Sequence, residues 1–186
     1  DPIAFFTHWF IECQKAEISE VNAMTLATVG AGNIPHARIV LLKGLEDNEF
    51  IFYTNYHSSK GSDIDNNPNV SLVFFWKELE RQVRIQGIAS KLPPGKSDEY
   101  FHSRPDASQL GAWASPQSEI IPQRDILDEN YSRYEKEFSG MRIPRPEHWG
   151  GYAVKPVAIE FWQGRISRMH DRIQFTLDEK GLWKKF

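Results

Sequence analysis

Nitrogen-rich side chains cluster between Glu160 and Arg172, where the sequence reads EFWQGRISRMHDR. This segment spans one or two neighbouring strands, and its even-numbered positions would share one strand face. Four side chains on that face could do chemistry: Trp162, Arg168, His170 and Arg172. Neighbouring cations repel one another, so an anion or an electron-rich ring is the natural partner for them. The alternative is a solvated sheet edge, where Arg and His discourage pairing with another edge.

Two other groups of residues suit phosphate. Ser58-Ser59-Lys60 precedes a short helical stretch that is expected to stop at Asn67-Pro68, and a serine cap with a lysine offers free N–H groups and positive charge. Tyr100 and Arg104 lie four residues apart on an expected helix, so they share one face, and Ser108 follows shortly. The alternatives are an ordinary serine N-cap and a Tyr–Arg stack on a surface helix.

Composition excludes several classes of protein. The 186 residues carry 40% hydrophobic and 25% charged side chains, as expected of one globular domain over 1–186. A net charge of -3 gives no electrostatic case for nucleic acid, so any anion site must be local. Cys13 is the only cysteine and the six histidines show no metal-ligand spacing, so neither a disulfide nor a metal site is expected. No apolar run approaches the ~20 residues of a membrane span, and a cytoplasmic location is expected.

The elements that must position these residues are mostly strands. Strands are expected at 22–29, 34–43, 49–55, 70–76, 80–92 and 152–161, with a closing hairpin over 174–186. Helices are expected from Asp1-Pro2 onward, after Ser58, over 95–103 and over 121–138, with a structured loop at 109–118. We expect 49–55 to pair with 34–43, and Gly87 to mark a bulge or a close approach to a ligand. Closely spaced strands joined by hairpin turns indicate a mainly β, antiparallel barrel or sandwich with peripheral helices.

Several long runs of sequence point to one family. They are RIVLLK (38–43), FYTN (52–55), ERQVR (80–84), YFHSRP (100–105), SQLGAW (108–113), PQS (116–118), HWGGY (148–152) and EFWQG with R-x-H-D-R (160–172). In this order, over essentially the whole chain, they resemble the pyridoxine/pyridoxamine 5′-phosphate oxidases. The resemblance implies an FMN-binding split barrel, an antiparallel Greek-key-like barrel with flanking helices, that forms a homodimer with FMN at the subunit interface.

The resemblance also assigns the site residues. FMN would be bound by Arg38, Ile39, Val40, Leu41, Leu42, Lys43, Tyr53, Thr54, Ser59, Lys60, Gln82, Gln117, Ser118, Trp162 and Arg172. Within this set, Arg38, Lys60, Gln117 and Ser118 would hold the phosphate and ribityl region, and Gln82, Trp162 and Arg172 would line the flavin. Lys43, Tyr100, Arg104 and Ser108 would bind the substrate phosphate, and the catalytic pair Arg168 and His170 would cover the substrate ring.

The implied reaction oxidises pyridoxine or pyridoxamine 5′-phosphate to pyridoxal 5′-phosphate, with hydride passing to flavin N5 and O₂ being reduced to peroxide. This sequence departs from the family pattern at Ser59, where an arginine is common. The family also has an N-terminal segment and a C-terminal Arg-Leu-x-Pro tail that would lie before Asp1 and after Phe186. Two alternatives stay open: a split-barrel flavin oxidase of the phenazine-biosynthesis type, and a carrier of FMN or pyridoxal phosphate without turnover.

Overall fold

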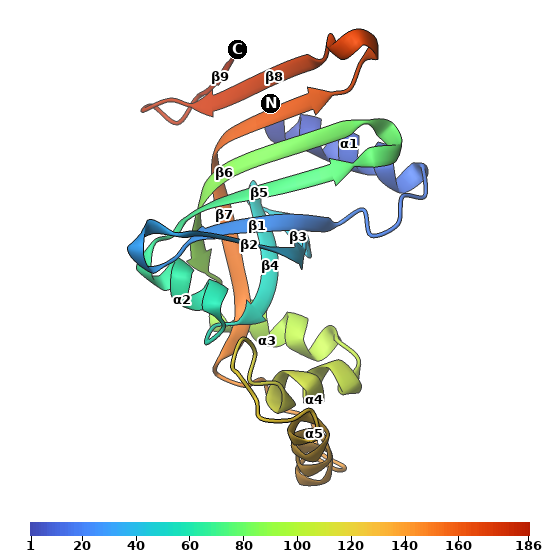
Figure 1. The fold of residues 1–186 in the computed structure, drawn as a ribbon, viewed down its shortest axis with the longest axis vertical. Helices are drawn as coiled ribbons and strands as arrows, with labels where there is room; N and C mark the ends of the chain where they lie inside the picture. Colours follow the sequence, from blue (N-terminus) through green and yellow to red (C-terminus); the bar gives the residue numbers. More distant parts are fainter.

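One curled antiparallel sheet forms the body of the protein. The computed structural model describes residues 1–186 and contains nine strands: β1 (Ala23–Val29), β2 (Pro35–Leu41), β3 (Gly44–Glu46), β4 (Glu49–Asn55), β5 (Asn69–Trp76), β6 (Arg81–Lys91), β7 (Trp149–Gln163), β8 (Asp171–Leu177) and β9 (Trp183–Lys185). Their order in the sheet is β2-β1-β5-β6-β7-β4-β3, and β8 adds to β7 and β9 to β8. Figure 1 shows the sheet curling between β8–β9 at one end and a group of helices at the other.

Five α-helices flank this sheet: α1 (Pro2–Lys15), α2 (Ser59–Asn66), α3 (Pro94–Ser103), α4 (Asp106–Ala114) and α5 (Asp125–Glu137). Three short 3₁₀ turns lie at Ala31–Asn33, Lys77–Leu79 and Ile166–Arg168. The helix α1 begins as expected, because the Asp1 carboxylate accepts a hydrogen bond from the Ile3 amide and Pro2 occupies the first turn. None of the helices has the length and apolar composition that crossing a membrane would require.

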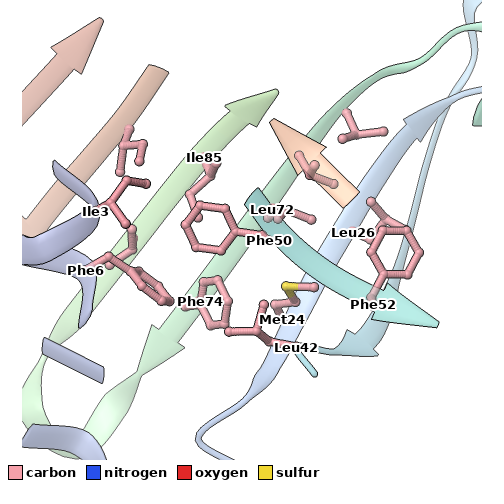
Figure 2. Close-up of a cluster of buried hydrophobic side chains, with 14 of the residues drawn as sticks. Ile3, Phe6, Met24, Leu26, Leu42, Phe50, Phe52, Leu72, Phe74 and Ile85 are labelled. Carbon is pink, nitrogen blue, oxygen red and sulfur yellow. The ribbon is translucent and has the colours of Figure 1, made fainter. Parts of the chain in front are cut away.

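The core lies between α1 and the concave face of the sheet. Phe6 of α1 is 1% exposed and packs edge-on against Phe50 of β4 and at a tilt against Phe74 of β5. Figure 2 shows these rings together with Leu72 and Ile85 from β5 and β6. A second, smaller cluster joins α3 and α4 to the start of β7; it contains Phe101, Leu110, Ala112, Ile143 and Trp149. The first cluster fixes the sheet, and the second fixes the helices at its end.

Three expectations from the sequence need correction. The strand β4 pairs with β3 and β7, not with the 34–43 segment, which pairs with β1 as β2. The 109–118 segment is not all loop, since α4 covers it to Ala114. The helix expected over 121–138 is shorter, at Asp125–Glu137. Of the one or two neighbouring strands expected within 160–172, the structure has two: β7 ends at Gln163 and its partner β8 begins at Asp171, so a turn carries Arg168.

Gly87 lies at a β-bulge, which is one of the two roles expected for it. The register between β6 and β7 shifts between Gln86 and Gly87. A Cβ atom at Gly87 would lie 2.6 Å from the Lys155 carbonyl oxygen of β7. The close approach of the two backbones therefore requires glycine here.

Gly87→Ala is expected to destabilise the fold by about 1–3 kcal/mol, because β6 and β7 must move apart at the bulge. Thermal unfolding of the purified protein measures this loss. Gly95→Ala is the matched control, because Gly95 is exposed in α3 and a Cβ there would have no neighbour within 4 Å. Equal melting temperatures for both variants would contradict the bulge requirement.

Candidate active site

A buried lysine lies where the serine-capped helix begins. The Ser58 side chain caps α2 by accepting a hydrogen bond from the Gly61 amide. Lys60, in the first turn, is 7% exposed, and its Nζ donates to Thr54 Oγ1 at 3.3 Å and to Ser58 Oγ at 3.1 Å. Burial and the charge of Arg38 lower the pKa of Lys60, and no carboxylate opposes them. The ammonium group is thus buried with hydroxyl partners only, which leaves its charge for an anion.

Arg38 of β2 lies close enough to Lys60 for the two charges to interact. Its Nη1 donates to Thr28 Oγ1 at 2.7 Å and to the Leu26 carbonyl at 3.2 Å. Its Nη2 lies 3.6 Å from a carboxylate oxygen of Asp63 in α2. Burial lowers the pKa of Arg38, and the Asp63 charge opposes this shift. The charges of Arg38 and Lys60 therefore interact, and one carboxylate, that of Asp63 in α2, lies beside Arg38.

Gln117 joins the same place from the segment after α4. Its Oε1 accepts hydrogen bonds from Thr54 Oγ1 at 3.2 Å and from the Asn55 amide at 3.3 Å. Ser118 follows with a φ of 71°, and both residues are exposed. Ser59 is exposed in the first turn of α2. The residues Ile39–Leu42 connect Arg38 of β2 to Lys43. The structure thus brings together Arg38, Thr54, Lys60 and Gln117.

A second cation, the half-buried Arg104, lies at the end of α3. The Arg104 guanidinium stacks over the Trp149 ring at 4.6 Å, and its Nη1 is buried with no hydrogen-bond partner. Burial lowers the pKa of Arg104, and only the Tyr100 phenol opposes this shift. A buried guanidinium N–H without a partner is costly unless a ligand supplies an acceptor.

Aromatic rings lie beside Arg104, and two of them line a small cleft. The rings of Tyr53 and Tyr100 stack at 3.9 Å, and Tyr53 also stacks on Trp149 at 5.5 Å. Burial raises the pKa of Tyr53 to about 12, so its phenol stays protonated. Lys43 lines a cleft of about 220 Å³ together with Tyr53 and Tyr100. Successive residues of a strand point to opposite faces. In β4, Tyr53 therefore stacks on Trp149 beside Arg104, while the next residue, Thr54, accepts a hydrogen bond from Lys60.

Ser108 lies in the first turn of α4 and is exposed. The next residue, Gln109, is buried, and its side-chain amide donates to the Arg104 carbonyl at 2.8 Å. This bond ties α4 to the end of α3. Ser108 is therefore placed near Arg104 along the chain, with no direct hydrogen bond between their side chains.

The nitrogen-rich segment forms the β7–β8 turn. In the sheet, Trp162 is the partner of Gln82 on β6 and of Arg172 on β8. The His170 ring lies 4.7 Å from the Trp162 ring, and its Nδ1 accepts a hydrogen bond from the Arg165 amide. Since Nδ1 is an acceptor, a neutral His170 carries its proton on Nε2.

Two arginines of this region share one carboxylate. Arg172 and Arg84 both contact Glu160, at 3.3 Å and 3.4 Å. Arg168 is exposed and has a φ of 63° in the turn. Gln82, Trp162, His170 and Arg172 are therefore brought together, with Arg168 in the adjoining turn.

The β7–β8 group and the Arg104 group lie at opposite ends of β7, as Figure 1 shows. This strand has 15 residues, a chain length of roughly 50 Å at about 3.3 Å per residue. One protomer therefore does not bring all the expected site residues into one place. Sequence reasoning also missed Trp149, under Arg104, and Asp63, beside Arg38. The spacing of Lys60 and Asp63, three apart on a short helix, was the available signal for Asp63.

Comparison with known proteins decides the family. Residues 10–136 match the family model described as pyridoxamine 5′-phosphate oxidase. The chain belongs to the pyridoxamine 5′-phosphate oxidase family. Residues 149–186 match the C-terminal dimerisation region of pyridoxine 5′-phosphate oxidase, which here comprises β7, β8 and β9. The resemblance seen in the sequence is confirmed.

Relatives within the pyridoxamine 5′-phosphate oxidase family match over nearly the full chain. The pyridoxine/pyridoxamine 5′-phosphate oxidase of Leptospira interrogans is 55% identical over 100% of this chain and 87% of its own length. That of Salinibacter ruber is 54% identical over 98% of this chain and 86% of its own.

Solved structures show the same fold. PhzG from Burkholderia lata, in complex with tetrahydrophenazine-1-carboxylic acid, has a TM-score of 0.94 at 26% identity and covers 100% of this chain and 91% of its own. An FMN-binding protein of Nostoc punctiforme related to pyridoxamine 5′-phosphate oxidase has a TM-score of 0.78 at 18% identity, covering 100% and 96%. The expected split-barrel fold with flanking helices is confirmed.

Proposed function

We propose that this protein is an FMN-dependent oxidase that converts pyridoxamine 5′-phosphate and pyridoxine 5′-phosphate to pyridoxal 5′-phosphate. The observation that carries the proposal is the presence of two cations without a carboxylate partner, the buried Lys60 and the half-buried Arg104, whose Nη1 is buried without a hydrogen-bond partner. One phosphate cannot neutralise both, whereas the reaction requires two phosphate-bearing molecules, the cofactor and the substrate. Membership of the family supports the same assignment.

The residues around Lys60 suit the phosphate end of FMN. Arg38 and Lys60 supply charge, Thr54 and Ser59 supply hydroxyl groups, and the start of α2 supplies free backbone N–H groups. Gln117 and Ser118 would complete this end of the site. When bound, FMN would supply the electron acceptor for hydride from the substrate C4′, with O₂ as the final oxidant and peroxide as its product.

The residues around Arg104 suit the substrate phosphate. Arg104 offers an unpaired N–H, and Ser108, in the first turn of α4, offers a hydroxyl group. Lys43 and Tyr100, which line the cleft, offer a cation and a second hydroxyl group. A phosphate bound by these residues would orient the substrate ring, and the residues would not contact the bond that breaks.

We propose that two protomers share each site, with FMN at their interface. The dimerisation region contains the β7–β8 turn, which a single protomer keeps remote from Arg104 and Lys60. A two-fold dimer allows the turn of one protomer to meet the helices of its partner. We also propose that residues 1–186 fold as one domain, because β7 is hydrogen-bonded between β6 and β4 in one sheet.

In this arrangement Arg168 would orient the substrate ring and stabilise negative charge that develops on it, and His170 would donate or accept a hydrogen bond there. Gln82, Trp162 and Arg172 would line the flavin. The exposed turn is consistent with side chains that act on a molecule held by a partner protomer.

Arg168→Ala is expected to slow flavin reduction by pyridoxamine 5′-phosphate roughly tenfold, the lower end of what a charge-assisted hydrogen bond contributes. FMN affinity should stay unchanged, because Arg168 is placed against the substrate only. Stopped-flow flavin absorbance measures the first quantity and FMN titration the second. Arg142→Ala, at another exposed arginine, is the control, and unchanged reduction in Arg168→Ala would refute the role.

The function itself is tested by anaerobic mixing of the FMN-loaded protein with pyridoxamine 5′-phosphate. Bleaching of the flavin absorbance that recovers in air, with formation of aldehyde and peroxide, is the expected result. Flavin that stays oxidised with the ligand bound would indicate a carrier instead. Bleaching by a dihydrophenazine carboxylate but not by pyridoxamine 5′-phosphate would indicate an oxidase of the PhzG type.

A further inference from the structure

A buried carboxylate stands behind the cations of the proposed FMN phosphate site. The Asp63 side chain is 9% exposed, and its Oδ2 accepts hydrogen bonds from Thr28 Oγ1 at 2.6 Å and from His36 Nδ1 at 2.9 Å. The same oxygen lies 3.6 Å from Arg38 Nη2. A carboxylate oxygen only accepts hydrogen bonds, so His36 Nδ1 must carry a proton. Three elements, β1, β2 and α2, meet at this one atom.

These contacts fix one edge of the Arg38 guanidinium. Both Nη1 protons are used, one by Thr28 Oγ1 and one by the Leu26 carbonyl, and the Asp63 carboxylate lies beside Nη2. A guanidinium has five N–H donors in a planar fork. The Nε proton and one Nη2 proton are left for another acceptor, which is the number that a bidentate phosphate contact needs.

We propose that Asp63 is a positioning residue for the cofactor phosphate, which it serves by holding the Arg38 guanidinium in its binding orientation. The inference rests on the proposed function, since it takes FMN as the ligand of Arg38 and Lys60. A free arginine side chain loses rotamer entropy when a ligand fixes it. Because Asp63 and Thr28 fix it before the ligand arrives, FMN binding does not bear that cost.

The charge balance of the site makes this positioning necessary. Arg38 and Lys60 repel each other when the phosphate is absent, and Asp63 is the carboxylate within ion-pair distance of Arg38. Residue 59, next to Lys60, is an uncharged serine, so the positive charge at this place comes from Arg38 and Lys60. Without Asp63, Arg38 is expected to turn away from Lys60 toward solvent.

Asp63 keeps its negative charge at all pH values of interest. Burial raises the pKa of Asp63, but hydrogen bonds from Thr28 and His36, with the charges of His36 and Arg38, lower it overall. The side chains that face Asp63 are therefore Thr28 on β1 and His36 and Arg38 on β2, with Lys60 beside Arg38. Asp63→Asn consequently removes a charge that is present in the native protein, with little change in volume.

The experiment compares FMN with riboflavin, which has the same ring but no phosphate. Apoprotein is titrated into each flavin and the fluorescence is followed. Asp63→Asn is expected to weaken FMN binding about tenfold and leave riboflavin binding unchanged. In an Arg38→Ala background, Asp63→Asn should have no further effect on FMN, because its role passes through Arg38. Asp65→Asn, exposed two residues later on α2, is the matched control.

Thr28→Val provides a second variant if Asp63→Asn does not fold. It removes the hydroxyl between Arg38 and Asp63 and should also weaken FMN binding selectively. An equal loss for FMN and riboflavin, or an undiminished loss in the Arg38→Ala background, would overturn the inference alone. Native protein that binds FMN no more tightly than riboflavin would overturn the proposed phosphate site and this inference with it.

Discussion

Lys60→Met is expected to weaken FMN binding roughly 10- to 150-fold without destabilising the cofactor-free protein. A hydrogen bond between charged partners contributes about 1.5–3 kcal/mol, and each 1.4 kcal/mol corresponds to a factor of ten in affinity. Lys60 is 7% exposed and has only hydroxyl partners, so water screens its attraction to a phosphate little. Methionine fills the space of the lysine stem and removes the charge.

The same substitution is expected to maintain or raise the stability of the apoprotein. Burial of an ammonium group without a counter-ion costs free energy, as the lowered pKa of Lys60 reflects. We therefore expect the melting temperature of apo Lys60→Met to equal or exceed that of the native protein. Added FMN should raise the melting temperature of the native protein far more than that of the variant.

Titration of flavin fluorescence and thermal unfolding with and without FMN measure the two effects. Lys77→Met, at an exposed lysine, controls for the loss of one positive charge from the molecule. A variant that loses apo stability but keeps its FMN affinity would show that Lys60 serves the fold and not the cofactor.

Local patterns in the sequence predicted the two places where phosphate would bind. The serine cap before Lys60 was recognisable because helix N-termini favour serine, and Tyr100 and Arg104 share a face because they are four apart on a helix. Local sequence patterns do not show which of these side chains are buried. Lys60 donates a hydrogen bond to Thr54 of β4, and the Arg104 guanidinium stacks on Trp149 of β7. The environment of each cation therefore depends on contacts between distant segments.

The incorrect pairing of β4 has the same cause. The polar turn Glu46–Asn48 does make a hairpin, but with the short strand β3, because β2 ends at Leu41 and pairs with β1. The partner on the other side of β4 is β7, about a hundred residues later in the chain. Turn residues specify which strands are adjacent in sequence, whereas a pairing at that distance is specified by packing.

The helix α4 was missed for a different reason. The segment 109–118 was expected to be a structured loop, and it contains Gly111 and Pro116, which disfavour a helix interior. Pro105 and Asp106 are favourable at a helix start, and Gln109, Leu110 and Ala112 are buried against the second core cluster. Packing of this face stabilises a helix whose intrinsic preference is weak.

Arg104→Met is expected to lower kcat/KM for pyridoxamine 5′-phosphate roughly 100-fold and to leave FMN affinity unchanged. The buried Nη1 of Arg104 has no partner within the chain, so its hydrogen bond with the substrate phosphate is not replaced by another when it is lost. Methionine keeps the apolar contact with the Trp149 ring, on which the guanidinium stacks at 4.6 Å. The fold should therefore survive the substitution.

The specificity of this loss distinguishes a substrate contact from a structural one. Pyridoxamine without its phosphate should be oxidised slowly and equally by the native protein and by Arg104→Met, because the lost contact is with the phosphate alone. Arg104→Lys should recover only part of the activity, since an ammonium group lacks the planar fork and the stacking of a guanidinium. Steady-state kinetics with both amines measures these effects. A loss that is equally large for the unphosphorylated amine would mean that Arg104 holds the α3–β7 junction in shape. The substrate phosphate would then have to be bound by Lys43 and Tyr100, which line the cleft.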